Sequence, residues 1–419
     1  MSADTPHPQL LRGLQLKELG RYADAESAFK EALAQEPNDA FALHQLAACQ
    51  WQIAGRQKDA LATINQAISV EPNDSEHHIL RAFILCVLDR PKDALAATVI
   101  ALQLAPTSDA AFTAEAQAHL QLSHWADAER AARQALALDA DNSSAANQLA
   151  QALRLQNKMD ENAGHLAGML ARDPGDPYTH ANAGWAALQS GDHRGAETHF
   201  REALRLNPNF ESAREGLLNS FRARSPLYRG YLKYCFAMQR LSSGARWAVI
   251  IGLYLAVRFT SYLGGWFGIL LGLAYVVFVL WVWVARPIGN LMLLSDHFAR
   301  YALRRPERIE ALVVGGCLTT GILALGAGVG FGSSEAITAG IALVAVSFPF
   351  ALLFTNGSRL GRYVFGTICA ITLLGAALSV AAPLLPGSEE IIASLFLIGC
   401  GGCILTTWIG NLPQLRQPL

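Results

Sequence analysis

Cys400 and Cys403 form a CxxC pair within the apolar run IGCGGCIL. This spacing occurs in metal sites and in thiol redox sites. A structural zinc ion needs about four ligands, and no second ligand pair accompanies this one. We therefore interpret both cysteines as small packing residues and predict no metal site.

Asp296, His297 and Arg300 are the only plausible residues for acid–base chemistry in the loop 286–310, which lies between two apolar segments. The chain has no glycine-rich phosphate loop, no GxSxG and no HExxH. Six further histidines are dispersed among the repeats and are interpreted as ordinary helix residues: His77, His78, His119, His124, His193 and His199. These observations predict a non-enzymatic protein without a cofactor, and a membrane enzyme is kept only as a third alternative.

Arg258 falls inside an apolar run, where an ionisable group suggests function by default. It lies about two helical turns from Gly264 and Gly265. Its long side chain can therefore reach outward to the surface or pair with an acidic residue there, namely Glu335, Glu389 or Glu390. We predict anchoring or structural pairing for this intramembrane charge, in preference to transport.

Composition divides the chain into two halves. The 419 residues carry a net charge of −1, and 52% of them are hydrophobic. Up to about Arg246 the sequence is rich in Ala, Gln, Asp and Arg, whereas long apolar runs dominate from Trp247 onward. Only lipid favours the second composition, and a nearly neutral chain lacks the basic face that nucleic acid requires. We predict a membrane protein that does not bind nucleic acid.

A period of 34 or 35 residues runs through the first half. Prolines mark it at Pro37, Pro72, Pro106, Pro174 and Pro208, and Ala140 takes the place of the missing one. The segments GRYADAESAFKEALAQEPND and GDHRGAETHFREALRLNPNF repeat a turn glycine, small residues and a final proline in the same order. At these residues the chain closely resembles the tetratricopeptide family, whose unit is two antiparallel helices. The resemblance implies an all-α solenoid of about six repeats plus a capping helix over residues 6–224.

Such solenoids hold extended peptides or a partner's helix in an inner groove lined by the first helix of each unit. The family's register implies the following partner-binding groove: Gln45, Gln52, Phe83, Gln117, Gln121, Asn147, Gln151, Arg154 and Trp185. Amides both donate and accept hydrogen bonds, and the aromatic residues suit an apolar side chain. A protein or peptide partner is therefore expected, with a merely solvated groove surface as the alternative.

The second half predicts a membrane domain over residues 247–412 with about six helices, after an interfacial linker over 225–246. Expected spans lie near 247–264, 266–285, 311–331, 335–355, 361–384 and 389–410. An interfacial helix is expected near 287–305, with its arginines close to anionic lipid headgroups. Small residues at every fourth position of the third span predict a helix-packing face, in this chain or with a second copy: Gly316, Thr320, Ala324 and Gly328.

Apart from Arg258, lysine and arginine of this half lie in alternate loops, including Arg286, Arg304, Arg359, Arg362 and Arg416. The positive-inside rule then places both termini and the repeats in the cytoplasm. The start MSADTPHPQLLRG has neither a basic nor an apolar signal region, which agrees. We predict a multi-pass scaffold of a bacterial inner membrane that recruits a protein or peptide, with a repeat-regulated channel or transporter component as the alternative.

Overall fold

The computed structural model describes residues 8–262, 265–297, 299–354, 356–382 and 387–410, together with Leu412 and Leu415. These residues form helices and no strand, so the predicted all-α class is confirmed. The contacts divide the chain into two compact units: Met1–Ala186 with Ala237–Arg246, and Ala187–Phe236 with Trp247–Leu419. The division falls within the sixth repeat, and not after the capping helix where we placed a boundary at residue 224.

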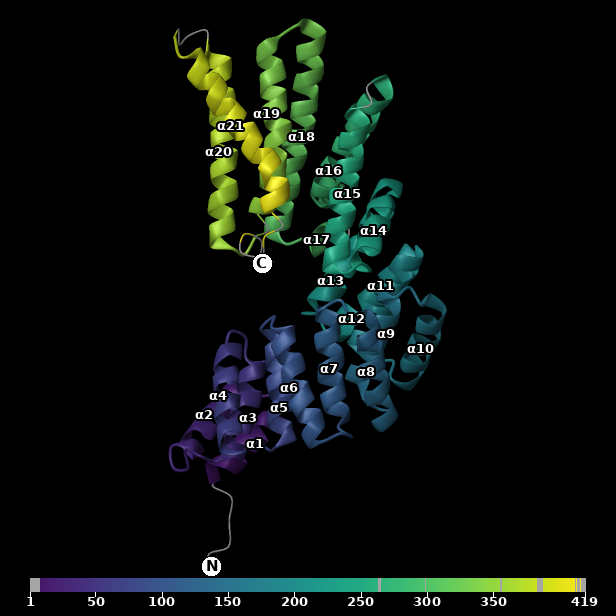
Figure 1. The fold of residues 1–419 in the computed structure, drawn as a ribbon, viewed down its shortest axis with the longest axis vertical. Coiled ribbons are helices and arrows are strands. Elements are labelled where there is room, and N and C mark those ends of the chain that lie inside the picture. The colour runs from purple at the N-terminus through teal and green to yellow at the C-terminus, as the bar shows by residue number, and fades with distance from the viewer. Residues whose placement is uncertain are drawn as a thin grey trace, which may run out of the picture. The chain divides into compact units, whose positions relative to one another are not determined.

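The first unit consists of helix pairs that stack in chain order (Figure 1). Its complete helices are α1 (Pro8–Glu18), α2 (Tyr22–Leu33), α3 (Ala40–Gln52), α4 (Gln57–Val70), α5 (Ser75–Val87), α6 (Pro91–Leu104), α7 (Asp109–Gln121), α8 (Trp125–Leu138), α9 (Ser143–Leu155) and α10 (Met159–Arg172). The helix α11 (Pro177–Ser190) begins in this unit and ends in the second. Two antiparallel helices per period are what the 34-residue pattern predicts.

Each helix pair closes through one residue with positive φ, where the chain reverses between its two helices. Glycine fills this place in three turns, at Gly20, Gly55 and Gly191. Short polar residues fill it in the other three, at Asp89, Ser123 and Asn157. The left-handed region costs glycine nothing, and asparagine or aspartate little, so the turn fixes these residue types.

Short polar side chains also set where the first helix of a repeat begins. The backbone N–H of Ala42 donates to Asp39, that of Ala111 to Ser108 and that of Ala145 to Asn142. Each bond satisfies an amide that the helix itself leaves without an acceptor. These N-caps follow the turn after the second helix, so proline and cap together mark the boundary between repeats.

Alanine fills the place where the two helices of a repeat cross. Ala25, Ala60, Ala94 and Ala128 are fully buried there. The fifth repeat departs from the pattern, because Asn162 takes the same place in α10 and is only 1% exposed. Neither its amide oxygen nor its amide nitrogen has a hydrogen-bond partner among the described residues. The weakest repeat of the sequence thus contains a buried amide without a hydrogen bond.

Asn162→Ala is expected to stabilise the first unit by about 1 kcal/mol, because it removes a buried polar group that lacks a partner and restores the residue of the other repeats. The measurement is the midpoint of thermal unfolding, followed by circular dichroism at 222 nm. Asn147→Ala, which removes an amide that does form hydrogen bonds, is the matched control and should lower the midpoint. A lowered midpoint for Asn162→Ala would contradict this account.

The second unit joins three amphipathic helices to a group of long apolar ones. The amphipathic helices are α12 (His193–Leu206), α13 (Glu211–Arg222) and α14 (Pro226–Gln239). The others are α15 (Ser243–Tyr262), α16 (Gly265–Leu294), α17 (Ala299–Ala302), α18 (Arg305–Phe331), α19 (Ser334–Leu353), α20 (Arg359–Ala381) and α21 (Glu389–Ile409). Most of α14 lies in this unit, where Tyr228, Leu232 and Phe236 are buried. The segment predicted as an interfacial linker is therefore a packed helix over these residues.

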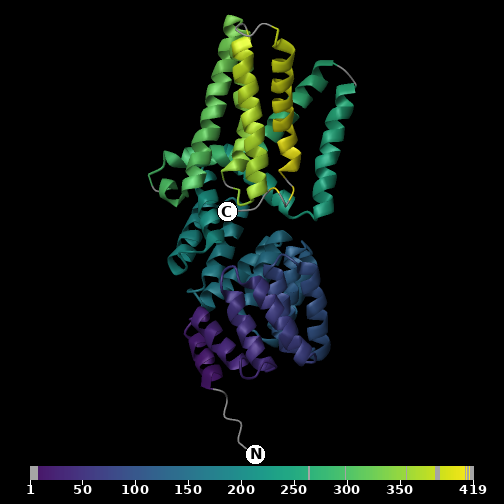
Figure 2. The same ribbon diagram turned by 90° about the vertical axis from the view of Figure 1, so that its left-hand side faces the viewer.

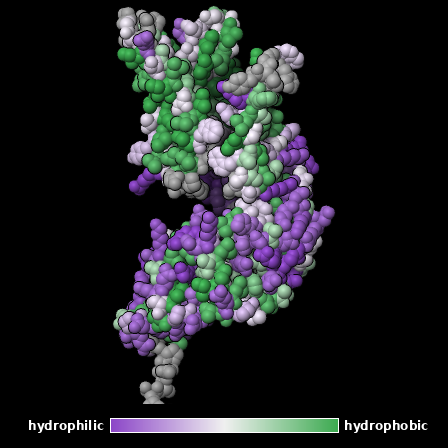
Figure 3. Space-filling model, viewed as in Figure 1, coloured by the Kyte–Doolittle hydropathy of each residue, from purple (hydrophilic) through white to green (hydrophobic). Residues whose placement is uncertain are grey.

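Five helices among the described residues are long and apolar enough to cross a membrane: α16, α18, α19, α20 and α21. The helices α18 to α21 lie side by side (Figures 1 and 2), and the face of them in view is mostly hydrophobic (Figure 3). The first of the six expected spans falls on α15. Within α15, the apolar stretch Gly244–Ala256 is shorter than the five helices named above. The predicted end of this span at Gly264 lies outside the described residues.

The predicted interfacial helix near 287–305 is wrong in its boundaries. Residues up to Leu294 continue α16 through Pro287, and α17 is a single turn of four residues. Proline has no N–H to donate, so the helix loses a hydrogen bond there. Packing against neighbouring helices allows the helix to continue despite that loss. The charged segment between the second and third expected spans therefore belongs mainly to the ends of α16 and α18.

Glycines bring α18 and α19 into close contact. A Cβ atom added at Gly340 would lie 2.8 Å from the backbone nitrogen of Leu325 and 2.9 Å from the carbonyl oxygen of Gly321. Of the four predicted packing residues, Gly328 is buried against Ile337, Ala324 is half-buried, and Gly316 and Thr320 are exposed. The face that packs within the chain is thus centred on Gly321 and Gly328, and the every-fourth-residue stripe meets it only partly.

Candidate functional site

The predicted groove residues lie on the first helices of successive repeats, α3, α5, α7, α9 and α11, all within the first unit. Gln52 and Gln121 are exposed, and Arg154 is buried. The others are half-buried: Gln45, Phe83, Gln117, Asn147, Gln151 and Trp185. Side chains that a partner can reach are therefore fewer than the register implied.

Several of the predicted amides hydrogen-bond to the neighbouring repeat. Lys17 Nζ donates to Gln45 Oε1 at 2.6 Å, and Gln121 Nε2 donates to the carbonyl oxygen of Cys86 at 3.0 Å. Gln148 Nε2 donates to Gln117 Oε1 at 3.2 Å. These amides connect adjacent repeats, which is a role that sequence reasoning missed.

Asn147 is the most heavily used of the amides. Its Nδ2 donates to Asp176 Oδ2 at 2.8 Å, and its Oδ1 accepts a bond of 2.8 Å from Asn182 Nδ2. Burial would raise the pKa of Asp176, but hydrogen bonds from Thr179 and Asn147 outweigh it and hold that pKa below its usual value. The spacing of Asn147 and Asn182, one repeat apart at 35 residues, is the signal that could have revealed this ladder.

The apolar and cationic groove residues are also engaged within the first unit. The ring of Phe83 stacks on Trp51 with the centroids 5.8 Å apart. Burial, together with the nearby Arg240, lowers the pKa of Arg154 to about 10, so its guanidinium remains charged at neutral pH. Arg154 is therefore a buried structural cation and a poor candidate for direct contact with a partner.

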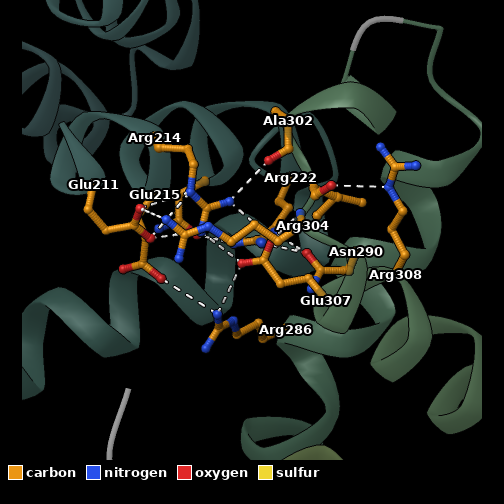
Figure 4. A network of polar contacts seen from close by, with 12 residues as sticks. Glu211, Arg214, Glu215, Arg222, Arg286, Asn290, Ala302, Arg304, Glu307 and Arg308 are labelled. Atoms are coloured by element: carbon orange, nitrogen blue, oxygen red, sulfur yellow. Dashed lines mark hydrogen bonds and ion pairs between the residues drawn. The ribbon is translucent and has the colours of Figure 1, made fainter. Parts of the chain in front are cut away.

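A second polar constellation lies in the second unit, where α13 packs on α16 and α17 (Figure 4). Arg214 on α13 forms two parallel bonds of 3.0 Å with the carboxylate of Glu307 on α18. It also donates to the carbonyl oxygen of Ala302 at 3.0 Å and pairs with Glu211. We call these residues, together with Arg286 and Arg304, the polar junction.

The polar junction is a network of alternating charges. Arg286 on α16 lies 3.6 Å from Glu307 and 3.7 Å from Glu215, and Arg304 Nη2 lies 2.6 Å from Glu211 Oε2. The hydrogen bond from Arg214 lowers the pKa of Glu211, and the pKa of Arg214 is raised because its two carboxylate partners outweigh its burial. Glu307 is 4% exposed, and a carboxylate so buried is stable only when paired.

Next to the junction, Arg222 ties α13 to α16 through a buried asparagine. Arg222 Nε donates to Asn290 Oδ1 at 3.1 Å, while Tyr228 Oη donates to Asn219 Oδ1 at 3.0 Å. A Cβ atom added at Gly289 would lie 3.0 Å from side-chain atoms of both Arg222 and Tyr228, so glycine gives these two side chains room that a larger residue would reduce. An asparagine inside an apolar helix was the sequence signal for this contact, and it was missed.

Family comparisons account for the periodic half of the chain. Models described as "Tetratricopeptide repeat" match residues 16–84, 113–177 and 177–210. These matched residues of the first half are tetratricopeptide repeats. No curated protein matches the sequence at a significant level.

Several solved structures are similar to about half of the chain. PilW, a type IV pilus biogenesis factor, is 19% identical with a TM-score of 0.44, over 50% of this chain and 96% of PilW. A repeat protein from Parabacteroides merdae is 17% identical with a TM-score of 0.44, over 56% of this chain and 93% of the other. YrrB, a repeat protein with an unusual peptide-binding site, is 19% identical with a TM-score of 0.33, over 44% and 95%.

Outside the tetratricopeptide repeats, the residues considered for chemistry have structural contacts. Asp296 accepts a bond of 2.9 Å from Arg224, and its other oxygen accepts from the backbone nitrogen of Ala299. Cys403 is buried, with its sulfur 3.3 Å from Thr372 Oγ1, which agrees with a packing role. Arg258 is exposed on α15, and its pairing with an acidic residue stays a prediction.

Proposed function

We propose that this protein is a membrane-anchored scaffold that recruits a protein or peptide to the cytoplasmic face of a bacterial inner membrane. The observation that carries the proposal is the polar junction. Through Arg214 and Glu307 the capping helix of the repeats is joined to two helices that are apolar enough to span a membrane. This packed contact within the second unit holds α13 against helices that can anchor the chain.

The distribution of basic residues supports a cytoplasmic location for the repeats. Arg286 and Arg304 flank the end of α16 and the start of α18, and Arg359 begins α20. The segment before α20 lies at this same end, because α18 and α19 are consecutive helices that pack side by side and bring the chain back to it (Figure 1). Asn356 Nδ2 there donates to the carbonyl oxygen of Leu415 beyond α21. Arginine accumulates in cytoplasmic loops, so the end of the apolar helices that α13 contacts is expected to face the cytoplasm.

Anchoring is tested on the full-length chain in its native membranes. We expect the protein to stay in the membrane fraction after alkaline carbonate extraction. We also expect trypsin to digest the repeats in inverted vesicles, and to leave them intact when added outside spheroplasts. Release by carbonate would refute anchoring, and digestion from outside would refute the cytoplasmic location.

Recruitment is tested with a photo-crosslinking amino acid at the two exposed groove positions, Gln52 and Gln121. Gln66 on α4 and Gln134 on α8 are matched controls, because they are exposed glutamines on second helices. We expect one protein to be captured at both groove positions and at neither control. Equal capture at all four positions, or none at the groove, would contradict a partner in the groove.

A further inference from the structure

Four side chains with metal-binding atoms meet between the second and third repeats. His44 lies on α3, Glu71 follows α4, Asp74 is the N-cap of α5, and His77 lies in the first turn of α5. All four are in the first unit. Neither the groove nor the polar junction includes any of them.

The distances around His77 suit a shared cation. His44 Nδ1 lies 3.1 Å from His77 Nδ1, and His77 Nδ1 lies 3.7 Å from Asp74 Oδ2. The ligand atoms of Glu71, Asp74 and His77 are all within 4.8 Å of one another, whereas His44 stands outside that group and approaches it through His77. Ligand atoms at about 2.0–2.1 Å from a tetrahedral zinc ion are separated by roughly 3.3 Å. The two histidine nitrogens are therefore spaced as two ligands of one ion would be.

The local structure holds two of these side chains in position. Asp74 Oδ1 accepts the backbone N–H of Glu76 at 2.8 Å, which leaves its other oxygen directed at His77. His77 is only 3% exposed, so its ring is fixed by packing. Preorganised ligands on helices need little rearrangement to bind an ion.

We propose that His44, Glu71, Asp74 and His77 bind a divalent transition-metal ion of the zinc class, which clamps the second repeat to the third. Imidazole and carboxylate are the ligands that zinc accepts, and two carboxylates balance its charge. The competing interpretation is a simple hydrogen bond between the two histidines, in which one Nδ1 carries a proton.

A second cluster is less suited to a metal ion. Ligand atoms of His119, His124 and Asp127 also lie within 4.8 Å of one another. Asp127, however, pairs with Arg130 at 2.7 Å, and His124 is exposed on the turn between α7 and α8. This cluster has one carboxylate, which a cation already occupies, so it serves best as the control.

The test uses the full-length protein in detergent, purified without a histidine tag and stripped with a chelator. Zinc is the probe for stoichiometry and calorimetric affinity, and cobalt is the probe for a visible absorption band of tetrahedral type. We expect one zinc ion per chain and a rise in the midpoint of thermal unfolding. His77→Gln and His44→Gln are each expected to weaken zinc binding by about tenfold or more and to abolish the cobalt band.

Asp74→Asn separates metal binding from folding, because asparagine is an equally good N-cap but a poorer ligand. We expect it to weaken zinc binding at least about tenfold while the metal-free protein unfolds as the unsubstituted protein does. His124→Ala should leave zinc binding unchanged. The proposal is overturned if the unsubstituted protein binds no zinc, if Asp74→Asn and His77→Gln bind it normally, or if only His124→Ala abolishes it.

Discussion

Glu307→Gln is expected to destabilise the second unit by about 3 kcal/mol, since it removes the buried counter-ion that the half-buried Arg214 and Arg286 share. Glu307 receives both bonds of the Arg214 fork, accepts the backbone N–H of Arg304 and lies 3.6 Å from Arg286. The glutamine keeps the shape of the side chain, removes its charge and replaces one of its two acceptor oxygens by a donor NH2 group. The expected observations are a lowered thermal midpoint in detergent and faster cleavage by trypsin after Arg222, which is 5% exposed.

Glu202→Gln is the matched control for this substitution. Glu202 pairs with Arg205 three residues further along α12, in the same unit but at the surface. Exposed pairs contribute roughly 0–1 kcal/mol, so the control should hardly change either measurement. The double variant Arg214→Met with Glu307→Met should recover part of the lost stability, because an apolar pair leaves no charge buried. Equal effects of Glu307→Gln and Glu202→Gln would show that the polar junction does not hold α13 in place.

Gly216→Ala is expected to separate α13 from α12 at a cost of about 3 kcal/mol, the upper end for overpacking. A Cβ atom added at Gly216 would lie 2.2 Å from two ring carbons of Phe200. Phe200 is completely buried, so its ring has no free space into which it can turn. The chemical denaturation midpoint of the full-length protein, followed by far-ultraviolet circular dichroism, should fall accordingly.

Gly164→Ala makes the same chemical change where there is room for it. Gly164 lies inside α10, and no atom outside its own helix turn is within 4 Å of an added Cβ. Alanine exceeds glycine in helix propensity by about 1 kcal/mol, so this variant should be slightly stabilised. Opposite signs for the two substitutions are the expected result, and a neutral Gly216→Ala would mean that α12 and α13 pack more loosely than described.

Features that depend on local sequence could be predicted well. The proline period, the turn residues Gly20 and Gly191, and the small residues Ala25 and Ala128 each act within a few residues of themselves. Helix pairs, their turns and the all-α class follow from such local rules. The apolar runs likewise predicted four of the long helices closely, since length and composition decide them.

Contacts between distant residues could not be read from the sequence. Arg214 and Glu307 are 93 residues apart, and each stands in a segment that looks like an ordinary charged helix surface. The groove amides were placed on the correct helices, but their bonds to neighbouring repeats depend on how the repeats stack. A family register identifies which face a residue occupies, and it does not tell what that residue touches.

The second expected span ended near residue 285, where charged residues begin to appear in the sequence. In the structure, α16 continues through Pro287 to Leu294. The continuation carries Asn290, which bonds to Arg222, and Gly289, which allows the close approach of α13. The helical turn that follows Pro287 therefore packs against α13, although proline by itself disfavours a continuous helix.

The length of α16 has a mechanical consequence. At a rise of 1.5 Å per residue its 30 residues extend about 45 Å, which is about 15 Å more than the hydrocarbon thickness of a typical bilayer. Arg286 and Asn290 lie in the last third of α16, and the part of the helix before them is apolar. If α16 rotated about its axis within the bilayer, Arg286 and Asn290 would turn with it. Their contacts with Glu215 and Arg222 would then transmit that rotation to α13.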